Sequence, residues 1–581
     1  MEDGSEFIYR NDFGGIWNST PFSTSAVAQA DTPPLSEPWD YSAQRIYGVN
    51  LGGWLTLEPF ITPALFEPFL NASTPAVDEW TLSENLGDRL AEVVEHHYAT
   101  FITEQDFARI AGAGLNWARI AVPFWALEVR EGEPFLAYVS WKYFLKAMGW
   151  ARKYGIRINL DLHTVPGSQN GWNHSGKYGP VGFLNGVMGV ANAQRTLNLI
   201  RSLTEFLTLP ENAEVVPMFS VLNEPFMETI GSFSLKSFYF EAYRTVRAVS
   251  GLGEGHGPMI TFHDGFKGTA RWYGFLPGSD RVALDSHRYL AFRDPNLDPM
   301  DLQALKPCAN WATDFNRTMA QVGVAMTGEW SVAVNDCGRF LNGVGLGTRF
   351  EGTFPSASDP NGPGASPVGG CEKWEDFMSW DEELKEGLKQ VALAHMDAFQ
   401  NWFYWTWKTS PSLLSPNPSL PSNPIWSYSL GLEHGYIPSN PRASLGFCDA
   451  NAKAHEVPPP KRFRFNRPLY DWQTGRGPIE ELGKINTTRA DAEGWSAFPP
   501  EWVGRGEARL RSEELPRLVR GEGKEGAVEV IGPRPSDAVD EGWRDQEGWW
   551  VEQKGCDYSS PWGGVGAEVL RGACTSLVRE S

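Results

Sequence analysis

Short apolar runs recur along the chain between residues 46 and 407, separated by stretches of mixed polarity. Eight runs stand out, at residues 46–51, 115–122, 156–163, 215–222, 259–263, 282–287, 322–329 and 402–407. Such runs are typical of parallel strands that are buried on both faces. Amphipathic helices are predicted between runs, at residues 88–98, 141–153, 193–207, 235–249 and 384–399. This alternation of strands and helices predicts an α/β fold around a parallel sheet.

Polar or ionisable residues, and one tryptophan, stand at nearly every predicted strand end. They are Arg119, His163, Glu224, His263, His287, Glu329 and Trp405. A doubly wound sheet would show the same strand–helix alternation. Because all eight strand ends converge on one site only in a closed barrel, these residues favour a (β/α)8 TIM barrel. Insertions rich in Gly, Pro and Ser at 338–370 and 409–424 predict long loops on the catalytic face.

Composition changes twice along the chain and indicates three parts. Residues 1–42 are rich in Ser, Thr, Pro and Asn and are interpreted as an N-terminal extension. Residues 43–455 hold the predicted barrel. Residues 456–581 are charged, Gly-rich and irregular, and no role is assigned to them.

The charge balance limits the class of partner. The chain of 581 residues carries a formal net charge of −21, which argues against nucleic acid or an anionic membrane, because phosphate groups are bound by Lys and Arg clusters. A neutral polymer fits better. The 25 tryptophans offer flat apolar faces that can stack on sugar rings, although most are expected in the core. No obligate protein partner is evident.

The cysteines and glycosylation sequons favour the secretory route. The six cysteines are far apart, without a C-x-x-C pair, and are interpreted as disulfide-forming. Five N-x-S/T sequons begin at Asn18, Asn71, Asn173, Asn316 and Asn486. The acidic first residues carry no apolar signal region, and no apolar span of ~20 residues occurs. We therefore expect an extracellular or cell-surface protein, with a signal or plasma-membrane anchor in a segment absent from this sequence.

A glutamate closes the fourth and the seventh apolar runs. Glu224 stands in Asn223-Glu224-Pro225, and Glu329 stands in Gly328-Glu329-Trp330. A single glutamate at a strand end is more often a solvated turn residue. Two together match glycoside hydrolysis, which needs one protonated carboxyl for the leaving oxygen and one ionised carboxylate at the anomeric carbon. Retention of configuration requires the two carboxyls ~5–5.5 Å apart.

The histidines at the predicted strand ends do not form a metal-binding motif. His163, His263 and His287 lie on three strands without an associated carboxylate triad, and the chain has no H-E-x-x-H. We interpret them as hydrogen-bonded pocket residues. Neither a metal nor an organic cofactor is expected.

Several ordered motifs resemble the fungal exo-β-1,3-glucanases (glucan 1,3-β-glucosidases) of glycoside hydrolase family 5, closest to their membrane-anchored branch. The resemblance covers residues from about 47 to 448. Its pieces are GVNLGGW at 48–54, LEPFITP at 57–63, DLH at 161–163, PGSQNG at 166–171, NEP at 223–225, HRY at 287–289, GEWS at 328–331 and WTWKT at 405–409. Where the family usually has aromatic-Asp-Asn-Ser-Gly, this chain has Trp172-Asn173-His174-Ser175-Gly176.

The resemblance implies a set of residue roles. Glu224 corresponds to the acid/base, Glu329 to the nucleophile, and Asn223 to the amide that holds the 2-hydroxyl of the sugar. The further implied site residues are Arg119 and His163 as supports of the two carboxyls, His287 and Tyr289 beside the nucleophile, Glu58 and Trp405 in the terminal glucose pocket, and Trp172 and Phe292 at its entrance. The implied disulfides are Cys308–Cys448 and Cys337–Cys371.

The implied activity is release of glucose from the non-reducing ends of β-1,3-glucan, with retention, in fungal cell-wall glucan metabolism. A preference for β-1,6-glucan, or glucosyl transfer to another sugar, would use the same scaffold. A non-catalytic glucan-binding or wall-structural protein is the alternative from another class. The presence of both glutamates argues against that alternative, whereas exo action rests on the resemblance alone.

Overall fold

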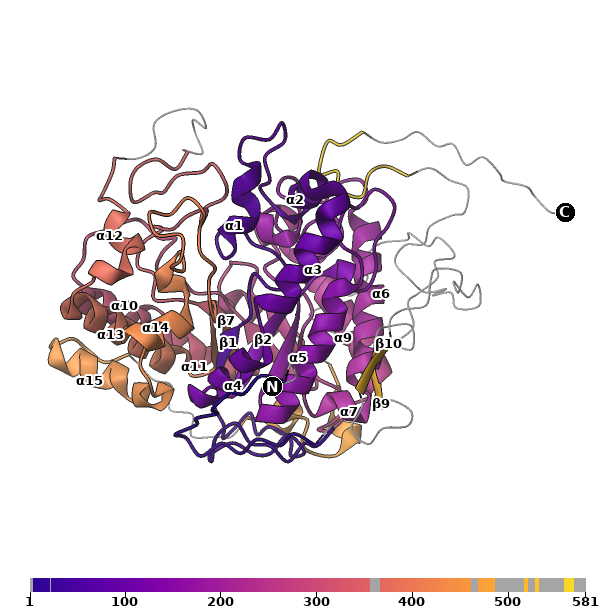
Figure 1. The fold of residues 1–581 in the computed structure, drawn as a ribbon. Coiled ribbons are helices and arrows are strands. Elements are labelled where there is room, and N and C mark those ends of the chain that lie inside the picture. Colours follow the sequence, from indigo (N-terminus) through magenta and orange to yellow (C-terminus); the bar gives the residue numbers. More distant parts are fainter. Residues whose placement is uncertain are drawn as a thin grey trace.

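Eight strands of the protein close into a barrel in a computed structural model, and two more, β9 (Arg517–Arg520) and β10 (Val528–Ile531), form a separate antiparallel pair. The structure describes residues 4–20, 22–355, 366–460, 469–485, 517–520, 528–531 and 558–568. Eight parallel strands follow one another around the barrel in chain order, as expected. Figure 1 shows the barrel strands among their helices. They are β1 (Tyr47–Asn50), β2 (Trp117–Val122), β3 (Arg157–Leu162), β4 (Met218–Ser220), β5 (Met259–His263), β6 (Val282–Asp285), β7 (Val324–Trp330) and β8 (Trp402–Tyr404).

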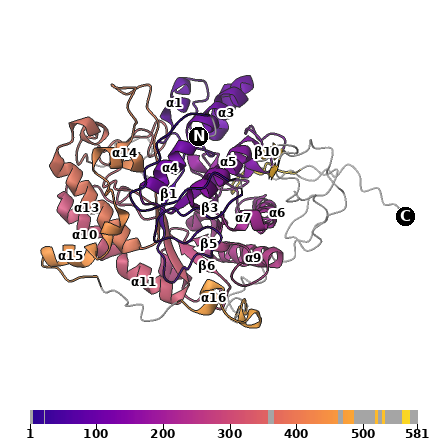
Figure 2. The same ribbon diagram turned by 60° about the horizontal axis from the view of Figure 1, so that its bottom comes forward.

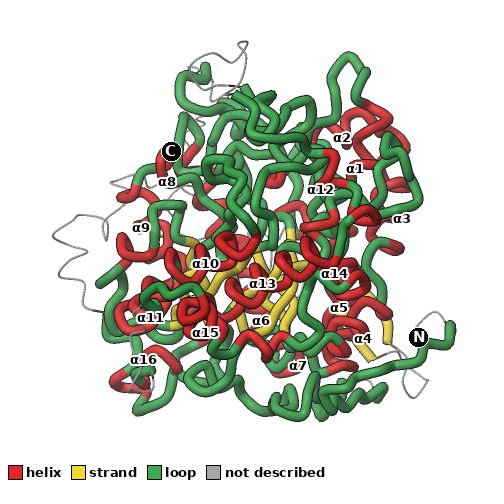
Figure 3. The backbone as a smooth tube through the Cα atoms, turned by 90° about the vertical axis from the view of Figure 1, so that its left-hand side faces the viewer, coloured by secondary structure: helices red, strands yellow, loops and turns green. Residues whose placement is uncertain are grey.

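Helices surround these strands, and long loops crowd one end of the barrel (Figures 2 and 3). The five helices predicted from the sequence form, as α3 (Leu90–Thr100), α5 (Val139–Tyr154), α6 (Gly189–Leu207), α9 (Ser232–Ser250) and α13 (Glu382–Phe399). The others are α1 (Pro63–Phe66), α2 (Glu79–Leu86), α4 (Glu104–Gly112), α7 (Pro210–Ala213), α8 (Met227–Ile230), α10 (Met300–Asn310), α11 (Ala312–Gln321), α12 (Glu372–Glu375), α14 (Tyr428–His434), α15 (Phe447–Ala454) and α16 (Asp471–Thr474). Between β5 and β6 the chain forms only a 3-10 turn, Thr269–Trp272, so one connection departs from strict alternation.

The barrel interior is apolar at one end and polar at the other. The apolar layer contains Trp117, Met218, Met259, Ala283, Val324, Met326 and Phe403. Two residues further along their strands stand buried polar side chains, among them Arg119, Ser220, Thr261 and Asp285. Gly48 makes room for this packing, because a Cβ there would lie 2.3 Å from the Phe403 ring. The packed layer thus forms a floor beneath the polar end of the barrel.

An irregularity in β7 determines where Glu329 points. Val324 and Met326 belong to the interior layer, so strict alternation would direct Gly328 and Trp330 inward as well. The pairing of β7 with β8 shifts register between Thr327 and Trp330. Beyond this shift Trp330 packs outward on His395 of α13, with ring centroids 5.1 Å apart, and Glu329 lines the cavity. A local break in the ladder therefore aims the carboxylate into the site.

The N-terminal segment and Leu469 close the apolar end of the barrel. The N-terminal segment runs beneath the strands, at the bottom of Figure 1. Trp39 packs edge-on against Trp117, with centroids 5.5 Å apart, and Leu469 joins the same apolar cluster. Arg157 donates to the main-chain oxygens of Pro34 and Glu37, each at 2.9 Å. The division at residues 42 and 455 remains a proposal, but parts of both flanking segments pack on the barrel.

A short C-terminal segment, 558–568, docks beside α2 on the loops at the carboxyl end of the barrel (Figure 1). The Trp562 ring lies 5.0 Å from Trp80 and 6.1 Å from Phe135, and its Nε1 donates to Glu133 at 3.3 Å. Asn192 of α6 donates to the main-chain oxygen of Pro561 at 2.7 Å. This part of the region 456–581, whose role the sequence left open, is therefore packed.

Two disulfides cross-link the protein, one between helices α10 and α15 and one within the long loop after β7. They join Cys308 to Cys448 and Cys337 to Cys371, the pairs that the resemblance implied. Cys556 and Cys574 lie outside the described residues. Among the helices that the structure describes, none is both long and apolar enough to cross a membrane.

Replacing Trp562 with alanine should destabilise the protein by about 3–5 kcal/mol, the cost of emptying a packed aromatic site. The side chain is only 8% exposed, whereas Val565 on the same segment is 79% exposed. Thermal unfolding of the full chain should therefore show a lower melting temperature for Trp562→Ala and an unchanged one for Val565→Ala. Equal melting temperatures for wild type and Trp562→Ala would contradict the docking of this segment.

Candidate active site

A cavity of about 540 Å³ opens at the carboxyl ends of the strands, a volume typical of small-ligand sites. Most of the site residues predicted from the sequence line it. They are Glu58, His163, Trp172, Glu224, His287, Tyr289, Phe292, Glu329 and Trp405. Arg119 and Asn223 are buried next to the two catalytic candidates, as the contacts below describe.

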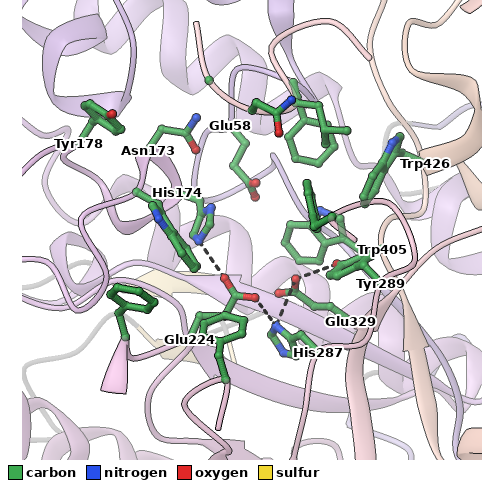
Figure 4. Close-up of a pocket in the computed structure, with 18 of the residues that line it drawn as sticks. Glu58, Asn173, His174, Tyr178, Glu224, His287, Tyr289, Glu329, Trp405 and Trp426 are labelled. Atoms are coloured by element: carbon green, nitrogen blue, oxygen red, sulfur yellow. Dashed lines mark hydrogen bonds and ion pairs between the residues drawn. The ribbon is translucent and has the colours of Figure 1, made fainter. Parts of the chain in front are cut away.

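One imidazole joins the two glutamates at the floor of this cavity. His287 Nδ1 lies 2.6 Å from Glu224 Oε1 and 3.3 Å from Glu329 Oε2 (Figure 4). These two oxygens can be no farther apart than the sum of the two distances, a limit compatible with the ~5–5.5 Å spacing of retaining glycosidases. The structure therefore brings together the two carboxylates on which the sequence interpretation depends.

Glu329 is held by an arginine and a tyrosine. Arg119 Nη1 donates to Glu329 Oε1 at 3.0 Å, and the Tyr289 hydroxyl donates to Oε2 at 2.9 Å. Arg119 Nη2 also donates to Asn223 Oδ1 at 2.6 Å and lies 3.0 Å from Asp161 Oδ2. These contacts fix an ionised carboxylate in one orientation, which suits a nucleophile.

His163 reaches the glutamates only indirectly. Its Nδ1 lies 2.6 Å from Asp161 Oδ2, and its ring stacks on Trp405 with centroids 5.7 Å apart. Because Asp161 also pairs with Arg119, His163 is linked to Glu329 through that carboxylate. The predicted supporting role of His163 remains a prediction.

The backbone at Glu224 adopts an uncommon conformation. Its φ of 45° lies in the left-handed region, which costs a non-glycine residue about 1–3 kcal/mol. The loop after β3 holds this strained turn, because Gln169 Nε2 donates to the main-chain oxygen of Asn223 at 3.0 Å and Asn170 Nδ2 donates to that of Glu224 at 3.2 Å. This loop therefore helps to direct the Glu224 side chain into the cavity.

Charges around Glu224 determine its protonation. Burial alone would raise the pKa of Glu224, but the charge of His287 and the hydrogen bond from His174 outweigh burial and hold that pKa well below its ordinary value. Burial alone would lower the pKa of His287, but the charges of Glu329, Asp285 and Glu224 raise it to about 10. At neutral pH His287 is therefore a cation between carboxylates.

Several buried polar atoms around the cavity have no hydrogen-bond partner among the described residues. They are Glu58 Oε1, His163 Nε2 and Asn223 Nδ2. Asn223 uses its oxygen to accept from Arg119, which leaves its Nδ2 hydrogens free for a ligand. Since buried polar groups are normally paired, these atoms fit a ligand that carries several hydroxyl groups.

Glu58 projects into the space above the two glutamates (Figure 4). Burial, together with the charges of Glu329 and Glu224, raises the pKa of Glu58 to about 8 against the opposing charge of His174. Below that pH the side chain is a neutral carboxyl that can both donate and accept hydrogen bonds.

Aromatic side chains surround the mouth of the cavity. Trp172 and Phe292, the predicted entrance pair, both line it. The sequence analysis missed Tyr178, Phe226, Phe266, Trp426, the insertion residues Leu341, Asn342, Arg349 and Phe354, and the polar residue His174. Phe266 could have been found from its place just after the fifth strand, since residues at strand ends converge on the site.

The donor atoms of Glu224, His263 and His287 lie within 4.8 Å of one another, close enough to consider a metal ion. His287 is protonated and directs both ring nitrogens at carboxylates, Nδ1 at Glu224 and Nε2 at Asp285 Oδ2 at 3.3 Å. A protonated imidazole has no lone pair for a cation. We therefore describe this cluster as a hydrogen-bonded network.

Comparisons with known proteins agree with this site. The chain is 39% identical over 439 residues to "Probable glucan 1,3-beta-glucosidase D" of Aspergillus terreus, which covers 72% of this chain and 50% of that protein. It is 38% identical over 443 residues to the protein of the same name from Aspergillus fumigatus, which covers 74% of this chain and 51% of the relative. The chain thus spans about half the length of the curated relatives it matches. No family model matches the chain.

Among solved structures, the fold is similar to that of "AoRut", with a TM-score of 0.53 and 20% sequence identity. That similarity covers 69% of this chain and 99% of the other. At this identity it supports the barrel fold alone. The sequence identity to the Aspergillus proteins confirms the relationship that the motifs suggested, and the matched part of the chain belongs to the same family as the fungal glucan 1,3-beta-glucosidase D proteins.

Proposed function

We propose that the protein is a retaining exo-β-1,3-glucanase that releases glucose from the non-reducing ends of β-1,3-glucan. The observation that carries this proposal is the contact of Glu224 and Glu329 with one nitrogen of His287 at the floor of the cavity. The names of the Aspergillus relatives support the choice of substrate. The unpartnered polar atoms and the aromatic mouth suit an uncharged sugar polymer.

The proposed reaction has two displacement steps at the anomeric carbon. In the first, a carboxylate oxygen of Glu329 bonds to that carbon while the bond to the leaving oxygen breaks. Glu224 passes a proton to that leaving oxygen. In the second, water attacks the anomeric carbon of the glucosyl ester and gives a proton to Glu224. Glu329 departs as a carboxylate. Each displacement inverts the carbon, so the product retains the β configuration.

The groups around Glu329 suit both steps. Arg119 and Tyr289 donate hydrogen bonds to its carboxylate, which orient it before attack and stabilise it again as it leaves. Asn223, with a free amide nitrogen beside Glu224, is placed to donate to a hydroxyl of the sugar. Glu58 and Trp405 are proposed to hold the terminal glucose, and Trp172 and Phe292 the next unit.

We also propose that the protein acts outside the cell, at the fungal wall. Two disulfides support an oxidising compartment. Among the sequons, Asn71 is exposed and can carry a glycan, whereas Asn316 is buried with its amide bonded to Ala312 and Gln400. Asn486 lies outside the described residues. A membrane anchor and a protein partner are not assigned.

Substituting either catalytic glutamate should abolish or strongly slow hydrolysis of laminarin, a β-1,3-glucan. Glu329→Gln removes the nucleophile and should leave only background release of glucose. Glu224→Gln removes proton transfer, which is worth about 10²- to 10⁴-fold for a poor leaving group. Glucose release by the purified variants checks both, and Glu92→Gln on the exposed face of α3 serves as the matched control. Wild-type rates in either variant would remove the catalytic proposal.

Product analysis should separate the proposed activity from its alternatives on the same scaffold. Wild type should release glucose as the first product of laminarin, with the β-anomer seen first by NMR, and should act more slowly on pustulan, a β-1,6-glucan. Longer oligosaccharides as first products would indicate endo action or glucosyl transfer. Binding of laminarin without any cleavage would support the non-catalytic alternative.

Glu58 should tolerate glutamine better than alanine at pH 6. Its pKa of about 8 makes it a neutral carboxyl at that pH, which an amide resembles in shape and hydrogen bonding. We expect KM of Glu58→Gln within about threefold of wild type, and KM of Glu58→Ala about 10- to 100-fold higher, from the loss of a buried hydrogen bond. Steady-state kinetics on laminaribiose check this. An alanine variant with unchanged KM would exclude Glu58 from the sugar pocket.

A further inference from the structure

Glu224 has an imidazole on each of its two carboxylate oxygens. His287 Nδ1 lies 2.6 Å from Oε1, and His174 Nε2 lies 2.9 Å from Oε2. His174 comes from the 3-10 turn Asn173–Ser175 in the loop after β3, and reaches Glu224 from the cavity side (Figure 4). It is one of the two positions, with Asn173, at which this chain departs from the motif of the family it resembles.

The two imidazoles are not equivalent. His287 is fully buried, and its nitrogens serve Glu224, Glu329 and Asp285 together. Removing its proton would leave three buried carboxylates without their shared cation, which is costly. The side chain of His174 is 20% exposed and contacts only the acid among these carboxylates. Of the two, His174 can therefore lose and regain a proton at lower cost.

The charged groups that face His174 come from four parts of the barrel. Glu224 follows β4, Glu58 lies in the loop after β1, Glu329 is in β7, and the His163 ring at the end of β3 lies 5.8 Å away. Burial alone would lower the pKa of His174, but the hydrogen bond from its ring to Glu224 and the charges of Glu224 and Glu329 raise it above its usual 6.5. His174 therefore keeps its proton to higher pH than a free imidazole does.

The loop holds His174 in place independently of the substrate. Asn170, four residues before His174 in this loop, donates through Nδ2 to the main-chain oxygen of Glu224 at 3.2 Å and so ties the loop to the backbone of the acid. The next residue, Ser175, is buried and bonded to Ser168 Oγ at 2.6 Å and to the main-chain oxygen of Trp172 at 2.7 Å. The His174–Glu224 contact is thus part of a fixed turn.

We propose that His174 is the proton partner of Glu224, a positioning residue that shares with the acid the proton passed to the leaving group. This inference rests on the proposed function. Before reaction, one proton lies between His174 Nε2 and Glu224 Oε2. When the glycosidic bond breaks, that proton moves to the leaving oxygen, and the pair is left as neutral imidazole and carboxylate. When water attacks the glucosyl ester, the pair takes up one proton from it, so the cycle closes.

This arrangement reconciles an acid of low pKa with acid catalysis. Glu224 between two cations is ionised in the resting site, so by itself it would have no proton to give near neutral pH. The pair retains a proton until the pH rises through the raised pKa of His174. The basic limb of the pH–rate profile should therefore report loss of the proton that His174 and Glu224 share.

His174→Asn keeps a polar side chain but cannot hold the proton, so it tests the inference directly. With laminaribiose, whose leaving group needs a proton, we expect kcat/KM to fall about 10- to 100-fold near pH 7. The basic limb should move to lower pH by about one to two units, because the proton must then reside on a carboxyl. With 2,4-dinitrophenyl β-glucoside, whose leaving group needs no proton, the rate should change little. His96→Asn, exposed on α3, is the matched control.

The outcomes are separable. An unchanged basic limb, or equal losses on both substrates, would overturn the role of His174 and indicate a purely structural one. If wild type cleaves neither substrate, the proposed function itself fails. If His174→Asn and His174→Gln do not fold, histidine NMR titration of Glu224→Gln replaces them. The pKa of His174 should then be lower than in wild type, because its carboxylate partner is gone, and an unchanged titration of His174 would contradict the pairing.

Discussion

The shared hydrogen bonds of one buried imidazolium organise the polar end of this barrel. His287 contacts Glu224, Glu329 and Asp285, three carboxylates that would repel one another if brought together without a cation. Arg119 is the second buried cation of this network. It bonds to the other oxygen of Glu329 and also contacts Asp161 and Asn223. Buried charges are tolerated only when paired, so the position of each carboxylate depends on these two cations.

The barrel supplies the geometry that this charge network requires. Apolar side chains fill the interior at one end, which the N-terminal segment and Leu469 cover, and the polar side chains collect at the other end. Asp285 illustrates how tight the packing is, since it accepts from the main-chain nitrogen of Gly328 and a Cβ at that glycine would lie 2.1 Å from its Oδ2. The register shift in β7 then turns Glu329 toward His287. Fold and electrostatics thus depend on each other.

Much of this could be predicted from the sequence, for identifiable reasons. Apolar runs mark buried parallel strands, and residues at their carboxyl ends must converge in a barrel, which placed Glu224, Glu329, His287 and Trp405 in one cavity. Period-two alternation could not predict the inward turn of Glu329, because a register shift leaves no signal in residue type. His174 and Trp426 come from irregular loops, whose course depends on tertiary contacts. Trp562 lies beyond an interval with no periodic pattern, so its docking was not foreseen.

The central claim is that Glu329 forms a bond with the sugar while Glu224 faces it across the same cavity. Incubation with a 2-deoxy-2-fluoro-β-glucosyl fluoride, which slows breakdown of the intermediate, followed by mass spectrometry of proteolytic peptides, tests it most directly. The account predicts one fluoroglucosyl group on the peptide that contains Glu329, and fragmentation that assigns it to that residue. Labelling of a different carboxylate, or steady glucan hydrolysis with inversion and no labelled peptide, would contradict it.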